Sequence, residues 1–214
     1  MEQDSSGLGR ALENLRRYGV LLESDPLLPS VVSLVAGEPI RGSWWSHPRG
    51  EAIFRVTRQL ADHPDVLVTK LISGKVTYVH RRLWPALLAA GTAQDAWQRR
   101  SLSLEARSVL DMLSRTGELR TADIPWTGGN KKSAPGETAR ELERRLLVHS
   151  EEVHTSTGAH GKRLETWELW AKRAGFVGEK TTPERAKEEL EQALEGLNRR
   201  FGANGRLPWN MASR

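Results

Sequence analysis

The chain has 214 residues, with 32 basic and 27 acidic side chains, a formal net charge of +5 and no cysteine. This length allows one large domain or two small ones, each with a hydrophobic core, and the lack of cysteine excludes a disulfide framework and a cysteine-ligated metal. No apolar run approaches the roughly 20 residues of a membrane span, and no signal peptide opens the chain, so we expect a cytoplasmic protein with no membrane partner.

The charges are distributed unevenly along the chain. Residues 1–39 carry three basic and six acidic side chains, whereas residues 40–100 carry ten basic and four acidic ones. A basic middle segment suits a polyanionic partner such as a nucleic acid. The alternative is a solvated basic face that binds nothing.

The first 39 residues have the pattern of packing helices. Leucines at positions 8, 12 and 15 recur at helical spacing, which predicts a helix over 8–18 that ends at Gly19. Asp25-Pro26 begins a second predicted helix, which continues through Leu34. We predict that the segment 1–39 packs against the rest of the protein and carries no chemistry.

Residues 40–49 have the most unusual composition, because Trp44 and Trp45 are adjacent. Neighbouring side chains on a helix or strand cannot both face one core, so either one indole is exposed or a loop buries both. The functional interpretation is a ligand or base-stacking platform made by Trp44, Trp45, His47 and Arg49. The structural alternative is a loop that the two indoles anchor in the core.

A helix and a hairpin are predicted next. The expected elements are a helix over 50–62, strands over 66–72 and 75–80 around a tight turn, and a helix over 85–90. We therefore predict a first winged-helix-like unit at 40–100, with Lys75 near the tip of its hairpin.

Residues 101–177 carry the clearest pattern of elements. Ser103 can cap a helix whose apolar residues recur at i, i+3, i+4 and i+7, and Gly117 can end it. The elements expected after it are a short helix over 121–124, a basic loop over 128–132, a helix from Pro135, and strands over 147–155 and 162–167. This order is that of a winged helix, a relative of the helix-turn-helix whose later helix enters a groove of DNA.

The last segment, 178–214, holds a capping box at Thr181 and Glu184, followed by a long apolar stripe at helical spacing. The stripe either packs on the body of the protein or binds a partner helix. The expected fold class is therefore mainly α with small antiparallel β-hairpins, in a tandem winged-helix architecture.

Two stretches, Leu119 to Ile124 and Tyr78-Val79-His80, resemble segments of the bacterial glycosylases that unhook DNA interstrand crosslinks. Leu119 to Ile124, followed by Leu142-Glu143 and a hairpin that ends in aromatic residues, is similar to the last winged helix of that family. Tyr78-Val79-His80 resembles the family's aromatic-x-His-Glu segment, with Arg81 in place of the glutamate. The resemblance implies a tandem winged-helix protein that acts on DNA.

The family's catalytic Gln-x-Gln or Gln-x-Asp signature belongs near the N-terminus, and none of this chain's glutamines provides it. His80 could orient a water molecule and is a weak catalytic candidate. A guanidinium at position 81 cannot act as a base and would disfavour a cationic sugar nearby. We therefore expect no excision of bases from DNA.

The residues expected to contact duplex DNA are basic side chains on the predicted later helix, on the loop before it and on the two hairpins. They are Lys131, Lys132, Arg140, Arg144, His160, Lys162, Arg163, Lys75, Arg81 and Arg82. Arg140 and Arg144 lie one turn apart on the helix, where the alternative is ion pairing with Glu137 and Glu141. The six histidines have no paired spacing on one helix, so we expect no metal site and no cofactor.

Three functions remain open on the sequence alone. The first is a non-catalytic DNA-binding protein related to the crosslink-repair glycosylases, which would associate with the bacterial nucleoid. The second is an active DNA glycosylase that acts on alkylated or crosslinked bases. The third is a winged-helix scaffold for protein interactions. The oligomeric state is not predicted.

Overall fold

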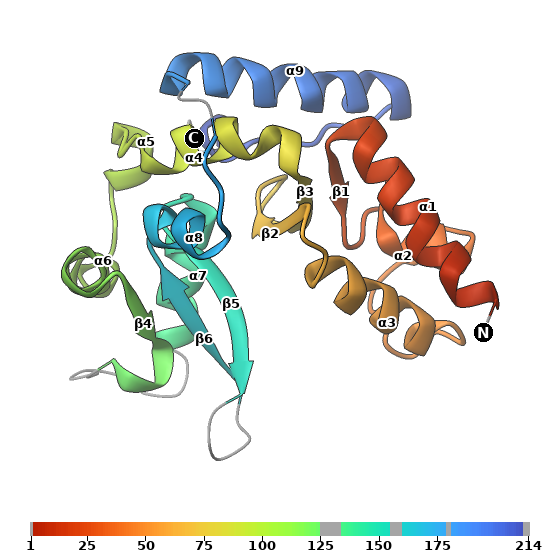
Figure 1. The fold of residues 1–214 in the computed structure, drawn as a ribbon, viewed down its shortest axis with the longest axis horizontal. Coiled ribbons are helices and arrows are strands. Elements are labelled where there is room, and N and C mark those ends of the chain that lie inside the picture. Colours follow the sequence, from red (N-terminus) through yellow and green to blue (C-terminus); the bar gives the residue numbers. More distant parts are fainter. Residues whose placement is uncertain (1, 125–133, 155–159, 179–180, 212–214) are drawn as a thin grey trace.

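The computed structural model describes residues 2–124, 134–154, 160–178 and 181–211. It is mainly helical and contains two small antiparallel sheets (Figure 1), which confirms the predicted fold class in outline. No helix among the described residues is both long enough and apolar enough to cross a membrane.

The N-terminal unit is built around a three-stranded sheet with strand order β1-β3-β2. Val20 pairs with Val79, and the hairpin pairs Val66 with His80. The elements of this unit are α1 (Glu2–Tyr18), β1 (Val20–Leu22), α2 (Val31–Ala36), α3 (Gly50–Ala61), β2 (Val66–Lys70) and β3 (Val76–His80). One hydrophobic cluster joins α1, α2, α3 and the sheet, with Leu15, Val31 and Ile53 at its centre.

The second unit repeats the same order of elements. Its sheet has strand order β4-β6-β5, and Leu164 of β6 pairs with both Leu119 and Ser150. The elements are α6 (Leu104–Thr116), β4 (Glu118–Arg120), the 3₁₀ turn η2 (Thr121–Asp123), α7 (Ala134–Arg144), β5 (His149–His154) and β6 (His160–Glu165). Leu113, Leu142 and Leu164 form its core.

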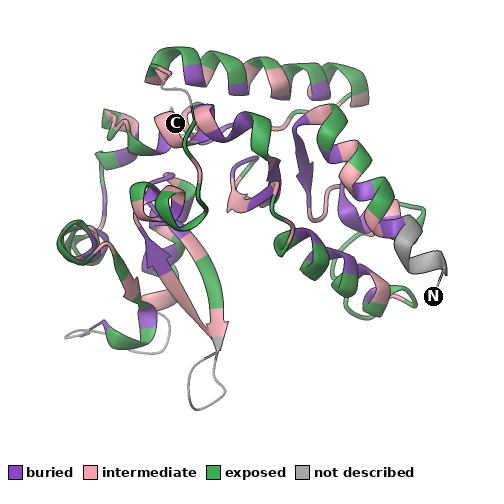
Figure 2. Cartoon of the chain, viewed as in Figure 1, coloured by how far each residue is buried: buried purple, intermediate pink, exposed green. Residues whose placement is uncertain are grey.

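A layer of helices joins the two units. Its members are the 3₁₀ turn η1 (Arg81–Leu83), α4 (Trp84–Thr92), α5 (Ala96–Arg99), α8 (Trp167–Arg173), α9 (Pro183–Phe201) and α10 (Pro208–Met211). The long helix α9 lies along α4 (Figure 1), and its buried face, visible in Figure 2, contains Leu190, Leu194 and Leu197. The apolar stripe predicted at 178–214 therefore packs on the body of the protein.

Aromatic side chains fix the second unit against this layer. The Trp170 ring makes an edge contact with Trp84 at a centroid distance of 5.1 Å, and the Trp167 indole donates a 2.7 Å hydrogen bond to the Leu146 carbonyl. Gly91 of α4 lies directly against the Trp167 ring, so that a Cβ there would come within 2.5 Å of the indole nitrogen. The relative position of the two units is therefore set by tight packing.

The structure differs from the sequence-based expectation in three places. Both predicted hairpins form, but each has a third strand, β1 or β4, on the same sheet. The predicted boundary at residue 39 separates segments that share a sheet and a hydrophobic cluster. The second helix starts at Val31, because the Ser30 hydroxyl accepts the Ser33 N–H and the loop after β1 closes back on that strand.

Candidate functional site

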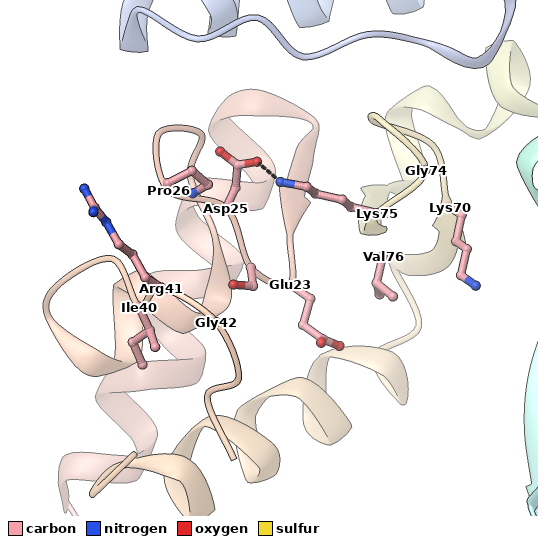
Figure 3. A pocket seen from close by; sticks show the side chains of 11 residues that line it. Glu23, Asp25, Pro26, Ile40, Arg41, Gly42, Lys70, Gly74, Lys75 and Val76 are labelled. Atoms are coloured by element: carbon pink, nitrogen blue, oxygen red, sulfur yellow. Dashed lines mark hydrogen bonds and ion pairs between the residues drawn. The ribbon is translucent and has the colours of Figure 1, made fainter. Parts of the chain in front are cut away.

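An open pocket of about 570 Å³ lies at the end of β1, between the loop that follows it, the loop around Arg41 and the tip of the β2–β3 hairpin (Figure 3). Its charged lining consists of Glu23, Asp25, Arg41, Lys70 and Lys75. Two carboxylates and three cations thus meet in one hollow, which is the combination expected of a site that handles a charged substrate.

The backbone of Glu23 is fixed from both sides. Its N–H donates to the Val76 carbonyl at 2.9 Å, and its carbonyl accepts the Val32 N–H at 3.0 Å. Burial raises the pKa of the Glu23 carboxyl, the Trp44 indole lowers it by a hydrogen bond, and the charge of Glu152 raises it again, so that the net shift is upward. A carboxyl with a raised pKa can exchange a proton closer to neutral pH than an ordinary glutamate can.

Asp25, two residues further on, has the opposite environment. One carboxylate oxygen accepts the N–H groups of Leu27 and Leu28 at 2.9 and 2.8 Å, and the other accepts from the Lys75 ammonium at 2.7 Å. Burial raises the pKa of Asp25, but the hydrogen bonds from Lys75, Leu27 and Leu28 outweigh it and hold the pKa below its usual value. Figure 3 shows Asp25 turned toward Lys75 while Glu23 extends away from this pair.

The second unit contributes charge close to the pocket. Lys70 of β2 reaches across to Glu143 of α7, with Nζ 2.8 Å from Oε2, and Glu143 also accepts from Lys162 of β6 and from Ser150. Burial raises the pKa of Glu143, but hydrogen bonds from Lys162, Lys70 and Ser150 outweigh it and keep the pKa low. This ionised, buried carboxylate therefore joins the N-terminal unit to the second unit beside the pocket.

The tryptophan pair separates into a buried and an exposed ring. Trp44 is 7% exposed and supplies the indole that reaches Glu23, whereas Trp45 is 65% exposed. The two rings stack with centroids 4.2 Å apart, and Phe54 lies 5.6 Å beyond Trp45. Of the two sequence-based alternatives, the exposed indole is the one that forms. His47 and Arg49 have local roles: the His47 ring accepts the Arg49 N–H, and the Arg49 guanidinium donates to the Val35 carbonyl.

His80 lies at the far end of β3 from the pocket, where its ring accepts the Arg82 N–H at 3.3 Å and caps η1. Burial lowers its pKa, and the charge of Arg82 lowers it further. Arg81 pairs with Asp65 at 3.6 Å, while the Arg82 guanidinium donates to the Arg17 carbonyl at 3.2 Å. The structure therefore does not bring these three residues to the pocket.

The side chains of the second unit that we expect to bind DNA differ in their ion pairs. Arg140 and Arg144 are exposed on α7; Arg140 pairs with Glu137, and Arg144 lies beside Gly74 of the first hairpin. Glu141 instead accepts from Ser103, at the start of α6.

The remaining members of that set lie on the hairpin and on the loop before α7. Lys162 is held by Glu143, and Arg163 pairs with Glu151 at 2.5 Å. Lys131, Lys132 and the side chain of His160 lie outside the described residues.

Glu23 and Asp25 are the residues that sequence reasoning missed. The resembled family's signature near the N-terminus contains glutamine, and Asp25-Pro26 has the composition of a helix start. The available signal was a Glu-x-Asp pattern placed directly after a short buried strand, because polar side chains at the end of a strand are positioned at a sheet edge. Within the described ranges, no group of three or more acidic or histidine side chains could hold a metal ion.

Comparison with known proteins gives one match. A family model described as "AlkZ related" matches residues 7–202, which includes both sheets, the pocket and the joining helices from α4 through α9. No curated protein and no solved structure matches the chain.

Proposed function

The chain belongs to the AlkZ-related family, which relates it to the crosslink-repair glycosylases, and from that premise we propose that it hydrolyses the N-glycosidic bond of a modified base in DNA at the Glu23–Asp25 pocket. The observation that carries the proposal is the pair of carboxyl groups whose pKa values are shifted in opposite directions within one hollow. In hydrolytic sites, two carboxyl groups whose pKa values are shifted apart in this way commonly have different acid–base roles.

In the proposed reaction, Glu23 acts as the general base. A water molecule attacks C1′ of the deoxyribose, the Glu23 carboxylate takes its proton, and the bond from C1′ to the base nitrogen breaks with its electron pair moving to the base. An alkylated base that carries a positive charge leaves as a neutral molecule and needs no separate acid. The raised pKa suits Glu23 to this role, since a stronger base near the working pH is the more effective catalyst.

Asp25 has a supporting part. Its lowered pKa keeps it ionised, so that its charge favours the cationic sugar of the transition state. Lys75 offsets part of that charge, and the two N–H bonds to Asp25 also order the loop that carries Glu23. Arg41 lines the same hollow and is suited to bind a phosphate beside the reacting nucleotide, whereas Lys70 is held by Glu143.

We further propose that both units are winged helices that dock the duplex. The shared order of helix, strand, short helix, helix and hairpin supports this, as does the matching strand order of the two sheets. Exposed Arg140 and Arg144 on α7 are the side chains best placed among the described residues of that unit. The Lys162 and Arg163 side chains are less suited to phosphates, because they are only 21% and 24% exposed besides being paired with Glu143 and Glu151. The Trp45 ring remains a proposed stacking surface for a base.

The docking proposal is tested by the double variant Arg140→Ala with Arg144→Ala. Each lost phosphate contact should lower the slope of log affinity against log salt by about 1, so fluorescence anisotropy with a labelled duplex across a salt series gives the answer. An unchanged affinity together with an unchanged slope would exclude docking through α7.

A second candidate function is DNA binding without catalysis. It is favoured by the absence of the resembled family's glutamine signature from this sequence, and by the ion pair that occupies Asp25. Release of a base from an alkylated duplex separates the two candidates, with Glu23→Gln as the variant that removes the proton acceptor. A protein-interaction scaffold would bind neither alkylated nor plain duplex.

A further inference from the structure

Four arginines gather at the end of β1 opposite to the pocket, where the chain leaves α1 and where η1 and the end of α9 meet it. They are Arg16, Arg17, Arg82 and Arg200, and all four are exposed. None belongs to the pocket lining. We refer to them as the arginine cluster.

Contacts of Arg17, Arg82 and Arg200, and the charge effect of Arg16 on His80, place the four residues near one another. The Arg17 and Arg200 guanidinium carbons lie 5.4 and 5.8 Å from the centre of the Tyr18 ring. The Arg82 guanidinium donates to the Arg17 carbonyl at 3.2 Å, and the charges of Arg82 and Arg16 both act on His80. Tyr18 itself packs edge-on against Phe201, with ring centroids 5.7 Å apart, so the cluster rests on an aromatic base.

The arginine cluster has no acidic partner in the described part of the chain. Its members form no ion pair there, whereas Arg81 next to them pairs with Asp65 and Arg55 with Glu51. Like charges held together without counter-charges repel one another and attract a polyanion. Where aromatic rings or a carbonyl already hold a guanidinium group of the cluster, that group loses little conformational freedom when it binds a phosphate. The planar guanidinium also matches the geometry of phosphate oxygens.

We propose that the arginine cluster is a second DNA-binding surface that grips the phosphate backbone of a duplex outside the pocket. Extended chain spans about 13 Å between Gly19 beside the cluster and Glu23 in the pocket, at roughly 3.3 Å per residue. This separation equals about four base-pair rises of B-DNA at 3.4 Å each, so one duplex can reach both places. The inference rests on the proposed function only in taking DNA as the partner, and it does not require hydrolysis.

The test uses the full chain and a labelled, undamaged duplex of about 20 base pairs, with anisotropy measured from low to physiological salt. The test variant is Arg17→Gln with Arg200→Gln. The matched control removes two exposed arginines of the second unit, Arg107→Gln with Arg115→Gln, and thus changes the net charge equally. Thermal unfolding of both variants is recorded, and Arg16→Gln with Arg82→Gln repeats the test on side chains that do not lie on Tyr18.

Loss of two phosphate contacts should weaken binding and lower the salt slope by about 2, and the control should keep the wild-type slope. A slope unchanged in both cluster variants, or lowered equally in the control, would overturn the proposal. So would tighter binding to phosphatidylserine vesicles than to duplex. The salt slope on an undamaged duplex reports binding alone, so this test gives a clear result even if the wild type hydrolyses no glycosidic bond.

Discussion

The ammonium of Lys75 lies 2.7 Å from the carboxylate of Asp25, and it joins the tip of the first hairpin to the loop that follows β1. The two residues are 50 positions apart in the sequence. Both residues line the pocket, and in the described part of the chain no basic side chain pairs with Glu23, two residues before Asp25. The opposite pKa shifts of the two carboxyl groups therefore follow from the burial of Glu23 and from the hydrogen bonds that Lys75, Leu27 and Leu28 donate to Asp25.

Lys75→Met should raise the pKa of Asp25, because the hydrogen bond and the charge that oppose burial are lost together. In the wild type, the pKa of folded Asp25 lies below its usual value. Asp25 therefore stabilises the folded protein at pH values above the usual pKa, and this stabilisation is lost as the pH falls through the lowered pKa. The variant should give up part of this contribution at neutral pH. Carboxyl NMR titration of Asp25 checks the shift, and an unchanged midpoint would mean that the backbone N–H groups alone hold it.

Trp44→Phe should raise the pKa of Glu23 further, because burial then acts without the indole hydrogen bond that opposes it. A partly buried acceptor left without its donor should also cost about 1–3 kcal/mol of the free energy of unfolding. NMR titration of the Glu23 carboxyl and urea unfolding measure the two effects. Trp45→Phe is the matched control, since its ring is 65% exposed. A Glu23 midpoint that moves equally in both variants would contradict the assigned hydrogen bond.

Glu165→Gln should destabilise the second unit by about 1–3 kcal/mol at neutral pH. The carboxylate is buried and accepts from the His149 ring at 2.9 Å and from the Arg173 guanidinium at 2.6 Å. Burial raises its pKa, but these two partners outweigh burial and lower the pKa to about 2.

The same carboxylate predicts how stability depends on pH. Because the native pKa is lowered, the contribution of Glu165 is complete above the ordinary value of 4.5 and is lost as the pH falls toward about 2. Unfolding measured from pH 6 to pH 2 should show a smaller acid loss in Glu165→Gln than in the wild type. Parallel curves for the two proteins would exclude this carboxylate as a source of acid sensitivity.

Local patterns predicted much of the fold. Helical periodicity located α6 and α9, and the β-rich runs around Ser73-Gly74 located the first hairpin. The third strand of each sheet was not predictable in this way, because β1 and β4 have three residues each and too little sequence to show a period. Their pairing is decided by tertiary contact with β3 and β6.

The candidate site was less accessible from the sequence than the fold. Asp25-Pro26 has the composition of a helix start, and only the return of the loop to β1 places Glu23 beside Val76 and Trp44. The adjacent tryptophans Trp44 and Trp45 are unusual by composition alone, but the link of Trp44 to Glu23 depends on a loop conformation. The sequence around His80 resembles a segment of the glycosylase family, whereas the His80 ring caps a 3₁₀ turn away from the pocket.

The most direct test of the proposed function is abasic-site formation on a nitrogen-mustard-treated duplex by the wild type, Glu23→Gln and His80→Ala, with a protein-free sample to measure spontaneous loss of bases. Removal of a general base should slow the reaction by about 10²–10⁴-fold. We expect abasic sites to accumulate with the wild type and with His80→Ala, and to fall to near the protein-free level with Glu23→Gln. A wild type that matches the protein-free sample, or a Glu23→Gln variant as active as the wild type, would contradict the assignment of this pocket as a glycosidic hydrolase site.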